Sequence, residues 1–486
     1  TQLQELHCDY MLINGLFTVK HSLSDQEMWD FMTNIIISVW PFIRKGLAFN
    51  VMSKQVDWER EDLFHVSLDQ IADFMHRLAG RNINFRADYG LHEFTVYAYK
   101  TSNDNTYINT EEKVANQYIS VCLPQLPQTA QLIPYLQQID QVRWYSNHGI
   151  LVKQFESRLA HHFKLEQNSV LSTSSGSSAL IGAILATAGL AQTQQPLALC
   201  PSYTYIATVS ALCLCGYQPY FVDVDSDQWQ LQAQSLLDHP QLQKVGIVVP
   251  VGIYGRPVLQ KDWLTFQQRT GIPVVIDMAA GFDSLSVYRN QTLGPIATII
   301  SLHATKVFSS AEGGVVLTTN TTIREKCRHI INAGYASDRR IVELGFNARM
   351  SEYHAAIGLA ELDGWSQKRQ AYIAVAERYH IMAMKYKIEA NMIIANDYAS
   401  SYVLFLTHTD EQATLIVQAL HRHHIDSRFW YGSGIHREPI FQERTRDKLP
   451  ITEALAPRLI GLPCYVDLSR PQIDNIVKTI AQTLIT

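Results

Sequence analysis

Short apolar runs rich in β-branched residues alternate with helical stretches through the middle of this 486-residue chain, and Gly, Pro or Asp residues bound most of the runs. SVLSTS (169–174) and LALCPSYT (197–204) are each followed by a segment with helical spacing. Five further runs are QPYFVDVD (218–225), KVGIVVPV (244–251), PVVIDMA (273–279), ATIISLH (297–303) and GGVVLTT (313–319). Because they lack the alternation of a half-exposed strand, the pattern predicts a mostly parallel sheet covered by helices.

The flanking regions follow other patterns, and we divide the chain accordingly. In residues 1–100, DYMLINGLF (9–17) predicts a buried strand, the stretch from about Asp25 to Gly46 has helical periodicity, and 81–100 predicts an antiparallel hairpin. The polar segment 101–113 is the predicted linker. A large domain is assigned to 114–364, with a helix over 150–163, and a smaller α+β subdomain to 365–486. Because the first residues, from Thr1, read as the middle of a domain, we expect a fragment of a longer protein or a degenerate fusion.

Composition narrows the class of protein. The formal net charge of −5 and the lack of a basic stripe argue against a nucleic-acid partner. No apolar run reaches the length of about 18 residues that a membrane span needs, and no signal peptide is evident. The seven cysteines are odd in number, mostly stand among apolar residues and do not have zinc spacing, so they predict buried, reduced thiols of a cytoplasmic protein without a metal site.

Three stretches carry candidate chemistry. TSSGSSAL (173–180) places serines and a glycine where a strand turns into a helix, and free N–H groups at a helix start favour a phosphate; a capping serine is the alternative. Asp277 ends the strand PVVID, at the sheet edge where open α/β sheets bind ligands, although it could simply cap the next element or form an ion pair. Lys306 stands between SLHAT and the pair Gly313-Gly314, either as a surface lysine or as a desolvated amine able to form an imine.

The three stretches together match the needs of pyridoxal 5′-phosphate (PLP). A helix start holds the phosphate, a carboxylate keeps the pyridine nitrogen protonated, and a lysine holds the aldehyde as an imine and moves the proton. The order and spacing of the serine-rich turn at 173–180, Asp277 and Lys306 therefore predict a PLP enzyme.

Residues ~115–486 resemble the DegT/DnrJ/EryC1/StrS sugar aminotransferases, a PLP group of fold type I. The motifs that carry the resemblance are RWYSNHG (143–149), SSGSSAL, PSYTYIAT (201–208), FVDVD (221–225), IDMAAGFDS (276–284), SLHATKVFSSAEGGVVLT (301–318), GFNARMSEYHAAIGLAELD (345–363) and LPCYVDLS (462–469). The resemblance implies a three-layer α/β fold with a mostly parallel seven-stranded sheet and a smaller C-terminal α+β subdomain.

The resemblance also assigns roles to single residues. Lys306 matches the lysine that carries the cofactor and acts in catalysis, and Asp277 matches the partner of the pyridine nitrogen. The remaining matches on the cofactor side are the phosphate ligands Ser177, Ser178 and Ser301, the stacking aromatic Tyr205, and Asn347 and Arg349, one of which reaches the neighbouring subunit's cofactor. The matches on the substrate side are Asn147, His303 on the lysine segment, and His436 in GSGIH.

The chain departs from the family pattern at two positions, which leaves the sugar and the aminated carbon open. Many members carry Gln or His where this chain has Ala280, and many carry His where it has Gly252. The resemblance implies transamination of a nucleotide-linked keto-deoxysugar in amino-sugar or polysaccharide biosynthesis, with L-glutamate as the expected donor. It also implies a homodimer with shared active sites. Because Lys306 is present, transamination is favoured over the dehydration performed by relatives with histidine there.

Residues 1–100 bear a weaker resemblance to the C-terminal half of a class I SAM-dependent methyltransferase, carried by DYMLINGLF, RKGLAFNVMS (44–53), EREDLFHVS (59–67) and FRADYGLHEFTVYAY (85–99). A partial Rossmann-like domain is therefore expected, without the glycine-rich SAM loop of the first half. The alternative is an unassigned α/β accessory domain. Two other functions stay open: a PLP-fold module that has lost catalysis, and a fused sugar methyltransferase as the main activity.

Overall fold

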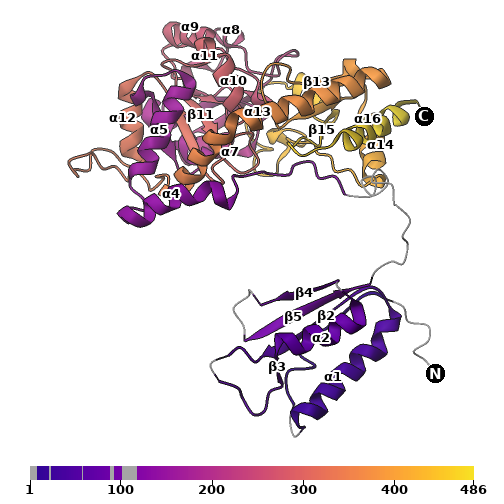
Figure 1. The fold of residues 1–486 in the computed structure, drawn as a ribbon. Helices are drawn as coiled ribbons and strands as arrows, with labels where there is room; N and C mark the ends of the chain where they lie inside the picture. Colours follow the sequence, from indigo (N-terminus) through magenta and orange to yellow (C-terminus); the bar gives the residue numbers. More distant parts are fainter. Residues whose placement is uncertain are drawn as a thin grey trace. The chain divides into compact units, whose positions relative to one another are not determined.

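The computed structural model describes residues 8–20, 23–56, 58–80, 82–87, 92–100 and 118–485, and divides the chain into two compact units, Thr1–Ile108 and Asn109–Thr486 (Figure 1). The predicted linker 101–113 lies outside the described residues. None of the helices in the described part of the chain is both long enough and apolar enough to cross a membrane.

The N-terminal unit is a mixed five-stranded sheet with two helices. Its elements are β1 (Cys8–Ile13), α1 (Asp25–Val39), β2 (Ile43–Ser53), β3 (His65–Val66), α2 (Leu68–Ala79), β4 (Ile83–Arg86) and β5 (Glu93–Tyr99). The strand order is β1-β2-β5-β4, with β3 paired to β2. β1 and β2 are parallel, whereas β5 runs antiparallel to both of its neighbours. The predicted hairpin of 81–100 is thus present as β4 and β5, and its tip at 88–91 lies outside the described residues.

Two details of this unit differ from the sequence-based expectation. The helix ends at Val39 rather than near Gly46, because Pro41 cannot continue the α1 hydrogen bonds; a 3₁₀ turn (Trp40–Phe42) leads into β2, which contains Gly46. β1 is not fully buried, since it pairs with β2 alone and lies at the sheet edge, where Leu12 is 79% exposed.

The C-terminal unit contains the predicted mostly parallel sheet. Its strands are β6 (Val170–Thr173), β7 (Leu197–Pro201), β8 (Gln218–Val222), β9 (Val245–Val248), β10 (Ile276–Asp277), β11 (Thr298–Ser301) and β12 (Gly314–Leu317). The orders β8-β7-β9 and β10-β11-β12-β6 are joined by two parallel bridges, Val248 to Val274 and Val251 to Asp277. Within 118–485, β12 is the one strand of the resulting seven that runs against the others.

Helices cover both faces of this sheet, as the resemblance implied. One apolar core joins the sheet to α5 (Ile150–Phe163), α9 (Gln260–Thr270) and α13 (Glu352–Tyr386); the other joins it to α6 (Gly176–Thr187), α7 (Ile206–Leu214) and α12 (Thr321–Ile331). Val170 and Leu171 are neighbours in β6 and belong to different cores, which is the alternation that a strand covered on both faces requires. Shorter helices are α8 (Ala233–Leu236), α10 (Phe282–Val287) and α11 (Arg289–Thr292), and α4 (Thr129–Val142) precedes α5.

A smaller layer follows α13 in the sequence. It consists of the antiparallel sheet β13 (Met392–Ile394), β14 (Val403–Leu406) and β15 (Leu459–Leu462), with α14 (Asp410–Arg422), α15 (Pro450–Leu455) and α16 (Arg470–Ile485). The 35-residue α13 contacts α5, α16 and β13, so it links the two layers (Figure 1). The predicted division between residues 364 and 365 falls inside this continuous helix.

Candidate active site

The predicted site residues gather at one edge of the large sheet. β6, β7, β10 and β11 are parallel to one another. Asp277 is the last residue of β10, and the segments after β6, β7 and β11 carry Ser177 and Ser178, Tyr205, and Lys306. Since the carboxyl ends of parallel strands meet at the same edge, the topology of the sheet brings these residues together.

A serine-lined turn forms the start of α6. Ser175 is the N-cap, and its hydroxyl accepts the Ser178 N–H at 3.1 Å, so the capping alternative is correct for this serine. The Ser178 hydroxyl lies 2.9 Å from that of Ser175, and Ser177 is exposed. A Cβ at Gly176 would lie 2.8 Å from the Ser301 Cβ, so the end of β11 packs directly on the helix start and leaves room only for glycine. The free N–H groups and the hydroxyls of this turn suit a phosphate.

Asp277 is a buried carboxylate at the end of β10. It is 4% exposed, and it accepts hydrogen bonds from Thr208 Oγ1 at 2.7 Å and from the Ala279 N–H at 3.0 Å. Burial raises the pKa of Asp277, while these two hydrogen bonds and the charge of Lys306 oppose the increase. Sequence reasoning missed Thr208, although its place one turn after Tyr205 in PSYTYIAT is a signal that could have found it.

Lys306 lies in the loop after β11, where its N–H donates to the His303 carbonyl at 2.9 Å. The side chain is half-buried, and its ammonium group makes no hydrogen bond or ion pair with the residues that the structure describes. Its charge acts on the carboxyl of Asp277. A half-buried amine without a described partner, whose charge acts on a buried carboxylate, fits the chemical role better than that of a solvated surface lysine.

Tyr205 and His303 flank this centre. Tyr205 is the N-cap residue of α7, one turn before Thr208, and its side chain is 63% exposed. His303 is exposed, with Nδ1 2.9 Å from Thr305 Oγ1 and Nε2 3.7 Å from Glu312 Oε1. Both side chains therefore remain available to a ligand at this edge.

The segment with Asn347 and Arg349 runs beside the serine turn. The Ala348 carbonyl accepts the Ser174 N–H at 2.8 Å. Arg349 donates to Asn332 Oδ1 at 2.9 Å, whereas the exposed Asn347 side chain has no hydrogen bond with any described residue.

The 147–149 loop contains strained backbone and an orphaned nitrogen. Asn147 and His148 have φ of 63° and 55°, in the left-handed region, and Asn147 is exposed. His148 Nε2 is buried and has no hydrogen-bond partner among the described residues. Burial, and then the charges of nearby arginines, lower the pKa of His148 to about 4, so its ring is neutral at pH 7. Sequence reasoning did not select His148.

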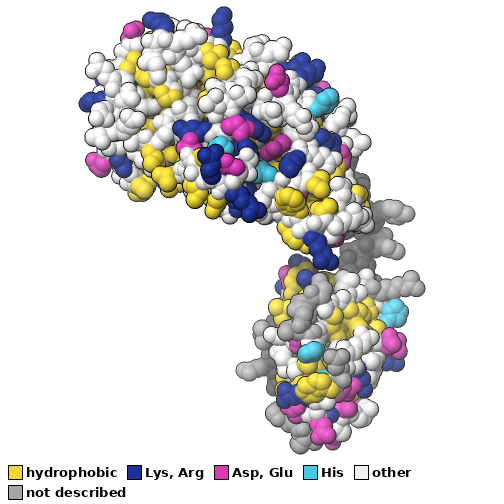
Figure 2. Space-filling model, turned by 90° about the vertical axis from the view of Figure 1, so that its left-hand side faces the viewer, with side chains coloured by type: hydrophobic (Ala, Val, Ile, Leu, Met, Phe, Trp, Pro, Cys, Tyr) yellow, Lys and Arg dark blue, Asp and Glu magenta, His cyan; other side chains and the backbone are white. Residues whose placement is uncertain are grey.

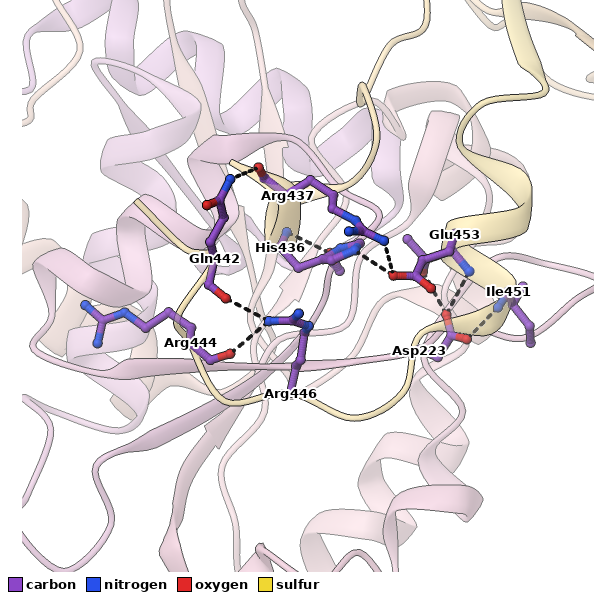
Figure 3. A network of polar contacts seen from close by, with 10 residues as sticks. Asp223, His436, Arg437, Gln442, Arg444, Arg446, Ile451 and Glu453 are labelled. Atoms are coloured by element: carbon purple, nitrogen blue, oxygen red, sulfur yellow. Dashed lines mark hydrogen bonds and ion pairs between the residues drawn. The ribbon is translucent and has the colours of Figure 1, made fainter. Parts of the chain in front are cut away.

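His436 does not join the residues around Lys306. It is 1% exposed, with Nδ1 2.7 Å from Ser202 Oγ and Nε2 3.3 Å from Glu453 Oε1 (Figure 3). In the described part of the chain its ring contacts none of the other predicted site residues.

The two departures from the family pattern have a structural counterpart. A Cβ at Gly252 would overlap the Met278 Sδ, so a buried methionine occupies the space that a larger residue at 252 would need. Ala280 supplies no polar side chain at its position.

The serine turn fits a phosphate, Asp277 fits a positively charged ring nitrogen, and Lys306 fits an aldehyde. These residues, together with a sheet covered by helices on both faces, define a PLP-dependent enzyme of the aminotransferase fold. The model of the DegT/DnrJ/EryC1/StrS aminotransferase family matches residues 127–481, and the chain belongs to this family.

Individual relatives resemble the chain over most of its length. The GDP-perosamine synthase of Escherichia coli O157:H7 is 29% identical over 376 residues, which cover 75% of this chain and 98% of that protein. The structure of DesI in the presence of its TDP-sugar product is 25% identical, covers 75% of this chain and 93% of DesI, and superposes with a TM-score of 0.66. NtdA from Bacillus subtilis, solved with bound cofactor PMP, is similar in fold with a TM-score of 0.64 at 19% identity, over 74% of this chain and 82% of NtdA.

Proposed function

We propose that the C-terminal unit transfers an amino group from an amino acid, L-glutamate, to the keto group of a nucleotide-linked deoxysugar in amino-sugar biosynthesis. The observation that carries the proposal is Lys306, which is half-buried, has no hydrogen-bond or ion-pair partner among the described residues, and acts by its charge on buried Asp277. The relatives named GDP-perosamine synthase and DesI, which was solved with its TDP-sugar product, support a nucleotide-sugar substrate. We place the reaction in the cytoplasm, where the seven cysteines, all of them free, stay reduced.

The residues of the site divide into those that bind and those that move a proton. Ser177, Ser178 and Ser301 would hold the PLP phosphate at the start of α6. Bound PLP supplies an aldehyde for imine chemistry and a protonated ring that withdraws electrons from the reacting carbon. Asp277 keeps the positive charge on the ring nitrogen favourable, and the Thr208 hydroxyl fixes one of its oxygens at 2.7 Å.

Lys306 would be both the covalent partner of the cofactor and the proton carrier. Freed by the amino donor, its neutral Nζ would accept the proton from the donor's α-carbon and return it on the cofactor side. In the second half-reaction the same Nζ would carry a proton in the opposite direction, and the sugar would receive the amine. The site is used twice in each turnover, so the kinetics are ping-pong.

The absorbance spectrum of the purified protein, with and without L-glutamate, tests the proposal. The wild type shows a near-violet band that glutamate shifts to the near-ultraviolet. Lys306→Ala loses this conversion, and Lys306→Arg, which keeps the charge but cannot form the imine, loses it equally. If no chromophore forms even with added PLP, the function is wrong and a catalytically degenerate module becomes the better interpretation.

We further propose a homodimer with shared sites. The arm of residues 335–344, which projects beside α12 (Figure 1), carries exposed Tyr335, Ile341 and Leu344, the last 84% exposed. Figure 2 shows one face of the C-terminal unit on which basic, acidic and histidine side chains gather, with hydrophobic groups below them. Exposed apolar side chains such as those of the arm are typical of association surfaces. Light scattering should give twice the chain mass, and a stable, active monomer refutes the dimer. If the site is shared, mixing Lys306→Ala subunits with Asn347→Ala or Arg349→Ala subunits restores partial activity.

We propose that residues 1–100 are a methyltransferase-like half-domain that does not bind SAM by itself. The support is the strand order β1-β2-β5-β4, in which the reversed β5 lies between two other strands, as at the C-terminal end of a class I methyltransferase sheet. Isothermal titration with SAM gives no heat of binding. Measurable binding overturns this assignment and favours a methyltransferase as the main activity.

A further inference from the structure

We propose that His436 is a positioning residue, which holds the turn after β7 so that Thr204 and Thr208 keep Asp277 in place. The inference rests on the proposed function for its catalytic consequence, although the contacts belong to the protein alone. It differs from the role in the substrate pocket that the resemblance implies for His436.

The segment that carries His436 crosses from the small layer to the large sheet. We call residues 428–452 the strap. It begins beside β15, where the Arg428 N–H donates to Gly461 O at 3.0 Å. It ends at α15, where Asp223 accepts the N–H groups of Ile451 at 2.7 Å and Thr452 at 3.0 Å (Figure 3). Each end of the strap is therefore fixed by hydrogen bonds.

The middle of the strap has two further anchors. At the edge of β8, the Asp447 N–H donates to Phe221 O at 3.0 Å, and the Asp447 carboxylate accepts the Tyr220 hydroxyl at 2.8 Å. At the end of β7, the Ile435 N–H donates to Ser202 O at 2.9 Å. His436 forms the second anchor together with Ile435, and this anchor holds the turn after β7 by hydrogen bonds, beside an edge-to-face contact between Tyr431 of the strap and Tyr203.

Ser202 contacts both the backbone and the ring of His436. Ser202 Oγ accepts the His436 backbone N–H at 3.1 Å and lies 2.7 Å from Nδ1. Nε2 lies 3.3 Å from Glu453 Oε1, which accepts from Arg437 Nη2 at 2.6 Å, but Nε2 itself forms no hydrogen bond with a described residue. A Cβ at Gly434 would lie 2.9 Å from Nδ1, so the strap bends at a glycine (φ 91°) to admit the ring. Nδ1 is in contact with Ser202 Oγ, and a side chain 1% exposed presents no open surface to a substrate.

Ser202 is connected to Asp277 through its own segment. Two residues further on, Thr204 Oγ1 lies 3.1 Å from Thr208 Oγ1, and Thr208 Oγ1 donates to Asp277 Oδ2 at 2.7 Å. The predicted stacking residue Tyr205 lies between the two threonines. An anchor at Ser202 therefore fixes the orientation of the donor to Asp277 and the position of the aromatic ring.

Four variants separate positioning from substrate binding. His436→Leu and Ser202→Ala remove the anchor from opposite sides. His436→Asn retains a short polar group near the place of Nδ1 and should rescue much of the effect. Asp447→Asn is the control, because it weakens the strap at β8 and leaves the contact with Ser202 intact.

The first readout is amide hydrogen exchange in the cofactor-free protein. The peptide that covers 202–208 exchanges about tenfold faster in His436→Leu and Ser202→Ala, as expected for the loss of one buried hydrogen bond. His436→Asn stays close to the wild type. Asp447→Asn accelerates exchange in the strap and not in 202–208.

The second readout is the kinetics of the two half-reactions. In His436→Leu and Ser202→Ala the glutamate half-reaction slows about tenfold, with little change in KM for the keto-sugar. If His436→Leu raises the sugar KM and leaves both the glutamate half-reaction and the exchange of 202–208 unchanged, His436 binds substrate and the inference is wrong. If the wild type lacks a glutamate half-reaction, the proposed function fails, while the exchange data still decide the positioning role.

Discussion

Replacing Thr208 by valine tests how strongly the binding of PLP by Asp277 depends on the hydrogen bond from Thr208. Valine has nearly the shape of threonine but no hydroxyl, so the change removes the 2.7 Å hydrogen bond to Asp277 Oδ2 without opening a cavity. Asp277 is 4% exposed, and the bond cannot be replaced by bulk water. Its other protein donor is the Ala279 N–H, which binds the opposite oxygen.

The magnitude follows from the charge of the acceptor. A hydrogen bond to a charged group contributes about 1.5–3 kcal/mol, more than one between neutral groups. Its loss raises the pKa of Asp277 further and weakens the pairing of the carboxylate with a positively charged ring nitrogen. We therefore expect PLP to bind about tenfold to a hundredfold more weakly to Thr208→Val than to the wild type.

Titration of the cofactor-free protein with PLP, followed by absorbance, measures this difference. Thr208→Ser keeps the hydroxyl and should bind PLP like the wild type. Inorganic phosphate should bind the serine turn of Thr208→Val with unchanged affinity, because Thr208 is not part of that turn. If Thr208→Val binds PLP normally, or if Thr208→Ser is equally weak, the hydrogen bond to Asp277 does not have the effect described.

Two further predictions concern stability. Burial lowers the pKa of His162 to about 4, so between pH 6.5 and 4 the unfolded chain binds a proton that the folded chain does not. Lowering the pH from 8 to 5 should therefore reduce the free energy of unfolding by about 1–2 kcal/mol more in the wild type than in His162→Phe. Equal losses of stability in urea denaturation of the two proteins at these pH values would contradict this. A Cβ at Gly281 would overlap the Met278 Cε. Gly281→Ala should cost about 1–3 kcal/mol and Met278→Ala about 2–5 kcal/mol, and the double variant should cost clearly less than their sum; additive urea-denaturation values would refute the overlap.

The elements that the sequence predicted well are those with a strong local signal. The helix expected over 150–163 is α5, with the same bounds, and the β-branched runs contain the strands of the large sheet. The end of α1 was misplaced because Ile43 and Leu47, the apolar residues after Pro41, continue a helical spacing while they belong to a strand. A periodic pattern shows which side chains are buried but not where the backbone changes conformation.

The core of the site was predictable because the topology of the sheet determines which residues lie at the same edge. Once the runs form parallel strands, residues directly after them, such as Asp277 and Lys306, must share an edge. The supporting contacts were not predictable in this way. Ser202 and His436 are 234 positions apart, and nothing local to either residue indicates the other. Roles transferred through the resemblance alone, such as those of Asn147 and His303, stay predictions.

Buried charged side chains are paired on α13 but not at the candidate site. On α13, Lys368 lies 2.5 Å from Glu361 and Arg369 2.8 Å from Asp283, and each of these carboxylates is buried beside its cation. Such pairing offsets the desolvation of both partners and is the ordinary structural solution. The charge of Lys306 acts on Asp277, yet no ion pair joins the two groups and no described residue neutralises the lysine. Unlike the two pairs on α13, this arrangement does not offset the desolvation of its groups, and it is explained if both groups bind the same ligand.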